Sequence, residues 1–359
     1  MKKSLFVMMI TAALMGGQVF ATDPIPTSVE GYAYTSSVGS FNFYYGAYKD
    51  DGSEASGGNV SVSASETGSD NSRSLVYGGY STQGGASDNI VTMTGGQVMS
   101  LYGGQGKTTV SGNTVIMTGG KVTDLFGGSG GTTSSVVTGN VAIVAGNCEI
   151  TDAVYGGDNP MAQGDSGNKI YLVGKGATAT IADAQGNTDT YEGGAITLNR
   201  IYGSSSGKPI NNSLDIYGTG ITATGGIDGV QILNFHIAGA LAEADEPMYS
   251  RPGSGATVFL TNTNLGFYSD DVQDWSAFDG KSITLVSVGH SVIGVEGSLG
   301  EVEIKGADGA TVATATLALE NDGKILVMSN IKGTAPIPEP TTGTLGLLAL
   351  AGLCIRRRK

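Results

Sequence analysis

Two aspartates at corresponding places of a repeated sequence are the residues whose type and spacing best suit chemistry. Asp124 and Asp152 each stand shortly before an aromatic residue, and Ser100 holds the same place one repeat earlier. Paired carboxylates on neighbouring repeats could act as acid and base on a polysaccharide, or could hold Ca²⁺. Aspartates are also frequent at strand ends and turns for structural reasons. Because two acids without a flanking basic cleft are a sparse constellation, we expect a protein that is not an enzyme and needs no cofactor.

The other groups able to do chemistry are isolated in the sequence. His236 and His290 lie in strand-like patterns, where a lone histidine usually has a structural role. The acidic stretch from Asp270 to Asp274 lacks the turn glycine and the closing glutamate of a Ca²⁺-binding loop. Cys148 aligns with small or apolar positions of neighbouring repeats. We therefore expect Cys148 to be a buried small hydrophobe rather than a reactive thiol, and we expect no metal site.

The elements that must position these residues are repeated along the chain. An aromatic residue followed by glycine recurs at Tyr77, Tyr102, Phe126 and Tyr155, with spacings of 25, 24 and 29 residues and a degenerate copy at Tyr202. An asparagine that opens an apolar stretch recurs at Asn89, Asn113, Asn140 and Asn168, with spacings of 24, 27 and 28 residues. Fixed periods of this size are typical of solenoids and arrays.

Period-two alternation inside each repeat predicts strands with one buried face. The alternating apolar pairs are Val91 and Met93, Val115 and Met117, Val141 and Ile143, and Ile170 and Leu172. Helix formers are scarce, and Gly-Gly pairs interrupt any helical pattern. We therefore predict an all-β fold, a parallel β-helix or β-solenoid with coils of about 24–29 residues. In this pattern residues 59–240 resemble pectin-lyase-like β-helices and autotransporter passengers.

The repeated residues have expected roles in such a coil. The glycines after each aromatic residue predict sharp corners, because glycine adopts positive φ without a Cβ clash. The aromatic side chains should stack one coil apart, about 5 Å along the axis. The four asparagines should form a ladder in which each amide bonds to the next. A phosphate-binding role for the glycines is disfavoured, because no helix follows them.

The chain divides into five segments by composition. Residues 1–21 have the pattern of a signal peptide, 22–58 that of an N-terminal cap, 59–229 that of solenoid repeats, 230–334 that of a β-rich C-terminal cap, and 335–359 that of a linker, an apolar helix and a basic tail. Within the C-terminal cap, the turns at residues 307–309 and 321–323 predict β-hairpins.

The N-terminus has the features of a secretory signal. Lys2 and Lys3 precede an apolar run from Leu5 to Met15, and the small residues before Thr22 predict cleavage after Ala21. The apolar run is too short to span a bilayer, which takes ~20 residues. We therefore expect an exported protein.

Three ordered features close the C-terminus. Pro338-Glu339-Pro340 is followed by an apolar run over residues 341–355 and by a basic end that includes Arg356, Arg357 and Arg358. An apolar helix of that length rises ~22 Å, less than the ~30 Å of a hydrocarbon core. The arginines should stay on the cytoplasmic side.

This tail resembles the PEP-CTERM sorting segment of Gram-negative bacteria. The resemblance implies recognition by an exosortase, a membrane cysteine transpeptidase, with residues 341–355 held transiently in the inner membrane. It also implies removal of the tail during export to the cell surface or extracellular matrix. A plain C-terminal membrane anchor is the alternative.

Charge narrows the classes of partner. Residues 22–340 carry 13 basic groups (19 less the 6 at the two ends) and 32 acidic groups, a net charge of −19. Such a body should repel nucleic acid and anionic lipid. Two function classes remain open: a surface-displayed adhesin-like or matrix protein that could bind glycans, and a secreted β-helix lyase or hydrolase acting on polysaccharide. The regular repeats of small residues favour the first.

Overall fold

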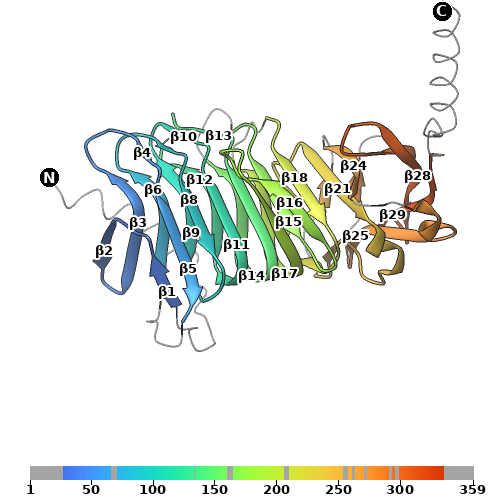
Figure 1. Cartoon of the computed structure of the whole chain (residues 1–359), viewed down its shortest axis with the longest axis horizontal. Coiled ribbons are helices and arrows are strands. Elements are labelled where there is room, and N and C mark those ends of the chain that lie inside the picture. Colours follow the sequence, from blue (N-terminus) through green and yellow to red (C-terminus); the bar gives the residue numbers. More distant parts are fainter. Residues whose placement is uncertain are drawn as a thin grey trace, which may run out of the picture.

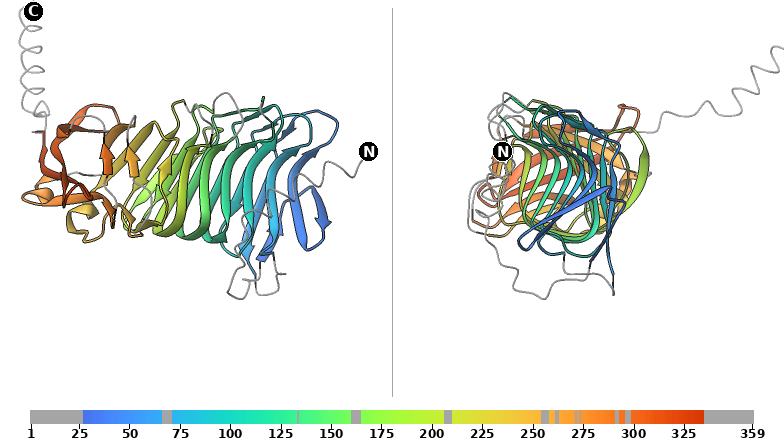
Figure 2. Two further views of the ribbon diagram at one scale, coloured as in Figure 1. Left: turned by 180° about the vertical axis from the view of Figure 1, so that it is seen from behind. Right: turned by 90° about the vertical axis from the view of Figure 1, so that its left-hand side faces the viewer.

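The computed structural model describes residues 27–65, 71–132, 134–159, 165–205, 210–253, 258–260, 263–270, 272, 274–290, 293–295 and 299–334. Within these residues the chain is all-β and winds into a β-solenoid of about seven turns (Figure 1). Seen along the long axis, successive coils lie one behind another (Figure 2). The predicted signal peptide and the tail from residue 335, with their cleavage, Pro-Glu-Pro and arginine positions, lie outside the described residues. No helix among the described residues is long and apolar enough to cross a membrane.

Parallel strands stack into three long faces and a short one. The first face holds β5 (Asn59–Ala64), β8 (Ile90–Met93), β11 (Thr114–Val122), β14 (Val141–Asp158), β15 (Lys169–Val173), β18 (Ser213–Tyr217), β21 (Ile232–Ala238) and β24 (Asn264–Asp270). The second continues β11 and β14 with β17 (Thr188–Ser204), β19 (Ile221–Ala223), β22 (Tyr249–Arg251) and β25 (Ser282–Val288). The third holds β3 (Phe41–Lys49), β6 (Ser74–Ser81), β9 (Ser100–Gly106), β12 (Asp124–Gly130), the ends of β14 and β17, and β20 (Ile227–Asp228). The short face holds β4 (Ala55–Ser56), β7 (Ala86–Ser87), β10 (Thr109–Ser111) and β13 (Val136–Thr138).

The core lies inside the coils and consists of columns of equivalent side chains. One column runs through Val60, Val91, Val115, Ala142, Ile170, Leu214 and Leu233, which are paired in register and fully buried. Each of these side chains packs on the apolar side chain at the same position of the next coil. A single coil cannot bury its apolar face alone, so the sequence must repeat.

An asparagine ladder runs beside this core, as the sequence predicts. The Nδ2 groups of Asn89, Asn113 and Asn140 donate to the Oδ1 of the next asparagine at 2.8, 2.9 and 3.0 Å. Asn168 extends the ladder to Asn212, at 3.1 Å, which sequence spacing did not reveal. All five side chains are fully buried. Each Oδ1 that accepts in this ladder also accepts the backbone N–H of the preceding asparagine, so the ladder satisfies donors that would otherwise be orphaned.

The glycines after the aromatic residues do not form left-handed corners, and that prediction is wrong. Gly104 and Gly128 lie inside strands β9 and β12 without positive φ. A Cβ on Gly104 would lie 2.6 Å from the Cγ of Asn113, and a Cβ on Gly128 would lie 2.6 Å from the Nδ2 of Asn140. Glycine is needed there because the strand crosses the asparagine ladder at close range. Left-handed corner glycines occur elsewhere, for example at Gly120, with φ of 97°.

One inside–outside assignment is also wrong. Val91, Met93, Val115 and Met117 face the core as predicted, but Val141 and Ile143 point outward from β14. The register pairs Val115 with Ala142, so Ala142 and Val144 are the inward residues of that coil.

A β-hairpin arm explains why Val141 and Ile143 are apolar. Strand β16 (Thr178–Ala182) pairs antiparallel with the start of β17, and its Ala179 and Ile181 pack with Val141 and Ile143 on the outer face. At the tip of the arm, the backbone N–H of Ala184 donates to Thr114 Oγ1 at 3.0 Å. The arm therefore lies across several coils and buries a second, outer apolar cluster.

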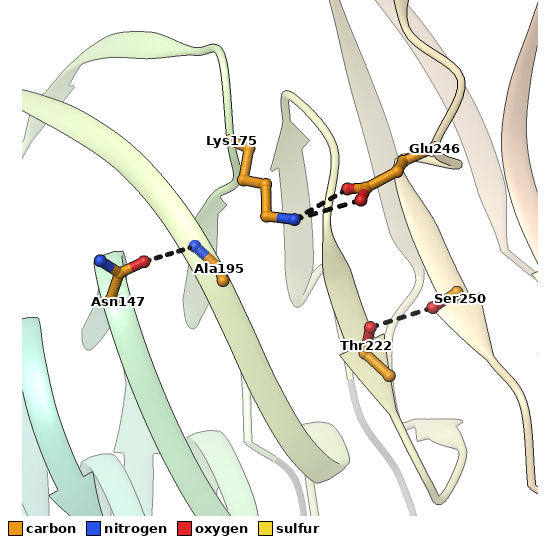
Figure 3. Close-up of polar contacts among 6 residues, drawn as sticks. All are labelled: Asn147, Lys175, Ala195, Thr222, Glu246 and Ser250. Carbon is orange, nitrogen blue, oxygen red and sulfur yellow. Dashed lines mark hydrogen bonds and ion pairs between the residues drawn. The ribbon is translucent and has the colours of Figure 1, made fainter.

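Polar contacts on the surface also join neighbouring coils (Figure 3). Asn147 Oδ1 accepts from the N–H of Ala195 at 3.0 Å, and the hydroxyls of Thr222 and Ser250 lie 3.1 Å apart. Lys175 Nζ lies 3.0 Å from Glu246, with both side chains about half exposed. Exposed pairs of this kind contribute roughly 0–1 kcal/mol, so the buried ladders and core columns contribute most of the coil-to-coil stability.

The two ends of the solenoid are built differently. At the N-terminal end, β1 (Thr27–Glu30) pairs antiparallel with β5, and β2 (Tyr34–Val38) pairs antiparallel with β3. At the C-terminal end, parallel stacking continues beyond residue 229 to β24, with β23 (Val258–Leu260) beside β26 (Ile293–Val295) and two short 3₁₀ helices at Gly239–Glu243 and Trp275–Phe278. The antiparallel strands β27 (Gly300–Lys305), β28 (Thr311–Glu320) and β29 (Ile325–Gly333) then link β24 to β25. The two hairpins predicted at residues 307–309 and 321–323 are confirmed.

Candidate functional site

The candidate site is built on an aromatic ladder along the third face. Tyr77, Tyr102, Phe126, Tyr155 and Tyr202 stack in order, with ring centroids 4.6, 4.4, 4.5 and 4.9 Å apart and planes within 12° of parallel. This confirms the stacking predicted from the repeat spacing. Tyr45 extends the ladder at the N-terminal end, at 5.2 Å from Tyr77. Because neighbouring rings cover each other's faces, the interior of the ladder offers no free ring face for a sugar.

The two predicted aspartates come together beside this ladder. Asp124 opens β12 in register with Ser100, as the sequence predicts. Between the second and third faces, Thr123 and Asp124 of one coil lie opposite three residues of β14, 151–153. The N–H of Asp152 donates to Thr123 O at 2.9 Å. Burial, followed by the charge of Asp152, raises the pKa of Asp124 to about 7, while a hydrogen bond from the N–H of Ala153 opposes that rise.

Asp152 has a different environment from Asp124. Its Oδ1 accepts from Asn199 Nδ2 at 3.3 Å, and Asn199 in turn accepts from Thr224 Oγ1 at 2.9 Å. Arg200 Nη1 donates to the Tyr202 hydroxyl at 2.9 Å on the neighbouring coil. The two carboxyls therefore lie in different environments: Asp124 has a raised pKa, and Asp152 accepts a side-chain hydrogen bond from the neighbouring coil.

A third carboxylate, which the sequence did not single out, joins the site. Asp158 ends β14 and accepts from Ser205 Oγ at 2.6 Å and from Ser129 Oγ at 3.4 Å. Burial raises the pKa of Asp158. The pKa values of Tyr102 and Tyr155 are raised first by burial, then by the charge of Asp124, and then by the charge of Asp158. The register of Ser129 with Asp158 could have been found by aligning the residues that follow each glycine pair.

The raised pKa of Asp124 predicts a pH-dependent stability. The folded-state value of about 7 lies above the ~3.9 of an unfolded chain, so this group's stabilising contribution is complete below about pH 4 and is lost as the pH rises through 7. Asp124→Asn removes the charge, and we expect it to raise the melting temperature by ~3 °C or more at pH 8 with little change at pH 4. Thermal melts at both pH values test this.

The matched control is Asp245→Asn, which removes the same charge from an exposed position. Its melting temperature should follow that of the wild type at both pH values. Equal shifts for Asp124→Asn at pH 4 and pH 8 would contradict a burial-raised pKa at this site.

Among the described residues, the histidines contribute no contact to the cluster of Asp124, Asp152 and Asp158. His236 Nε2 is 3.0 Å from Asp215 Oδ1, which also accepts from Asn234 Nδ2 at 2.9 Å. The His236 ring stacks on Tyr217 at 3.8 Å and on Tyr268 at 5.4 Å. These contacts fit the structural role expected for it. His290 lies in an exposed bend beyond the end of β25, so its placement in a strand is wrong.

The remaining candidates have structural contacts. Asp274 accepts the N–H of Ser276 at 2.9 Å and caps a 3₁₀ helix, and Asp271 and Gln273 of the same stretch lie outside the described residues. Cys148 is buried in the core, where burial raises its pKa to about 12. Within the part of the chain that the structure describes, no group of three or more His, Cys, Asp or Glu side chains is arranged to hold a metal ion.

Comparison with protein-family models, with curated proteins and with solved structures finds no match for this chain. Function must therefore be argued from the residues and their geometry.

Proposed function

We propose that this is an exported, non-enzymatic protein that acts at the cell surface or in the extracellular matrix of a Gram-negative bacterium, as a structural or adhesin-like component. The observation that carries the proposal is the long outer surface made by stacking about seven coils. Solenoids of this kind present extended binding surfaces, which suit a polymeric partner such as a matrix polysaccharide. The net charge of −13 over the whole chain disfavours nucleic acid as a partner.

The chain ends support the export route. The Lys2–Ala21 pattern favours a cleaved signal peptide, and the Pro338-Glu339-Pro340 motif with residues 341–355 and the arginines favours a PEP-CTERM-like sorting helix. An exosortase-type transpeptidase is then the processing partner, with a precursor held briefly in the inner membrane. In this proposal the coils of 24–29 residues form an autotransporter-passenger-like or pectin-lyase-like body between the two signals.

The alternative is a secreted β-helix polysaccharide lyase or hydrolase. Its support is specific: Asp124, with its pKa raised to about 7, lies beside Asp152, and such a pair could divide acid and base roles. Against it, the contacts of both carboxylates are coil-to-coil bonds that a structural role also explains.

The deciding experiment uses protein recovered from the medium or cell surface, with its intact mass measured to show whether residues 1–21 and the arginine end have been removed. Wild type and Asp124→Ala/Asp152→Ala are incubated with acidic and neutral polysaccharides, with and without Ca²⁺. We expect binding by both proteins and release of no shortened product. Depolymerisation by the wild type that disappears in the double variant would favour the enzyme, and retention of the complete C-terminus would count against the sorting route.

A further inference from the structure

The two ends of the solenoid offer different surfaces to a partner. At the C-terminal end, β27, β28 and β29 bridge from β24 to β25, so antiparallel strands fold over the last coil (Figure 1). At the N-terminal end, β2 pairs with β3 alone among the described strands and leaves its other edge unpaired. An unpaired edge carries backbone donors and acceptors that can extend the sheet with another strand.

The register of β2 shows which of its residues face outward. Val38 and Phe41 are paired across a two-residue turn, and Ser36 is paired with Phe43. In a hairpin of this kind the pair next to the turn is hydrogen-bonded, and hydrogen-bonded pairs alternate with non-hydrogen-bonded pairs along the strands. The N–H and C=O groups of Thr35 and Ser37 therefore point away from β3, toward the open edge.

The edge lacks the usual protection against pairing. Natural edges are guarded by charged residues, proline or bulges, yet the ten residues from Gly31 to Ser40 contain no charged residue and no proline. Strand β1, by contrast, ends in Glu30 and follows Pro24 and Pro26 in the sequence. For two copies that each carry a net charge of −13, this neutral strand is a place where they can approach without direct charge repulsion.

Exposed aromatic side chains lie at the same end. Tyr34 is 46% exposed although it stacks on Tyr48 at 4.6 Å, and Tyr32 is 41% exposed although it contacts Tyr44 at 5.0 Å. They are two of the six exposed large apolar or aromatic side chains among the described residues. A partner strand beside β2 would cover part of Tyr34.

We propose that β2 is a self-association edge, at which two copies of this chain pair their β2 strands antiparallel about a two-fold axis at Ser36. Thr35 of each copy then exchanges hydrogen bonds with Ser37 of the other, and Tyr34 lies across from Val38. The contact is isologous, and because the opposite end is covered by antiparallel strands, assembly stops at a dimer. A five-residue edge buries little area, so the dimer forms at concentrations on the order of micromolar.

The two-fold axis allows a sharp test by cross-linking. Facing residues of a non-hydrogen-bonded antiparallel pair have Cα atoms about 4.5 Å apart, within the range that a disulfide spans. Ser36→Cys should therefore give a covalent dimer under mild oxidation. Thr190→Cys, at an exposed position of the arm, is the matched control and should give no more dimer than the wild type.

A solution measurement completes the test. Sedimentation velocity of the purified wild type should show a concentration-dependent monomer–dimer equilibrium, and Ser37→Pro, which removes one outward N–H, should shift it at least tenfold toward monomer. Ser37→Lys, which keeps that N–H and guards the edge with charge, should act in the same direction. A wild type that stays monomeric throughout, that forms species larger than a dimer, or whose Ser36→Cys variant cross-links no better than Thr190→Cys would overturn the proposal.

Discussion

Asn113→Asp should cause one of the largest losses of stability available to a single substitution in this protein. The Nδ2 of Asn113 donates to Ala86 O at 2.9 Å and to Asn140 Oδ1 at 2.9 Å, in a fully buried position. Asn113 Nδ2 also donates to Ser111 O at 3.1 Å, so the substitution replaces this donor with an oxygen that faces three acceptors. Unsatisfied buried groups cost about 1–3 kcal/mol each, and more when charged. We expect the free energy of unfolding to fall by ~3 kcal/mol or more.

Chemical denaturation at pH 7 and at pH 4 would measure this loss. The loss should be smaller at pH 4, where a protonated carboxyl can donate one of the three lost bonds. Asn264→Asp is the matched control, because it makes the same charge change at an exposed position of β24. Similar losses for the two variants would mean that the ladder contributes little to the stability of the coils.

Gly104→Ala is the second substitution with a large expected effect. A Cβ at this position would lie 2.6 Å from both Cγ and Oδ1 of Asn113, closer than atoms in contact can approach. Either the strand or the ladder must move, and overpacking of this kind costs typically 1–3 kcal/mol. Gly104→Val should cost more, because it adds two further methyl groups to the same space.

Substitutions at two other glycines separate the effect of a close contact from the effect of backbone strain. Gly139 has φ of 63° with nothing within 4 Å of its Cβ position, so Gly139→Ala tests backbone strain alone, at about 1–2 kcal/mol. Gly239 has no positive φ, and a Cβ added there would meet nothing within 4 Å, so Gly239→Ala should be nearly neutral. Thermal melts of the three alanine variants should rank Gly104 first, then Gly139, then Gly239. If Gly139→Ala were the most destabilising, backbone conformation rather than close approach would dominate at these sites.

The Asn113 and Gly104 predictions both concern the contact between the glycine-bearing strands and the asparagine ladder. Strands β9 and β12 can pass over the asparagine ladder because they carry glycine at the crossing, and the ladder in turn fills the space that a Cβ would occupy. The Gly-Gly pairs and the asparagines therefore repeat together. Asp124 lies on β12 four residues before Gly128, so loss of this contact should disturb Asp124 as well.

The sequence by itself determined the repeated features. Tyr102, Phe126 and Tyr155 stack, and Asn89, Asn113 and Asn140 bond in order, because in a parallel stack residues at the same place in each repeat become neighbours. The turn residues of the C-terminal hairpins also act locally and could be recognised directly. The pairing of Asp124 with Ser100 follows for the same reason.

Only the tertiary structure decided features that depend on a second segment of chain. The arm inserted at residues 178–192 turns Val141 and Ile143 into buried outer residues, and it lengthens one repeat so that Asn212 lies 44 residues from its partner Asn168. The close approach at Gly104 depends on where the side chain of Asn113 lies in the folded coil. Sequence periodicity shows which residues repeat. It does not show which face of a coil another segment covers, or how closely the two approach, because the packed segments share no sequence pattern.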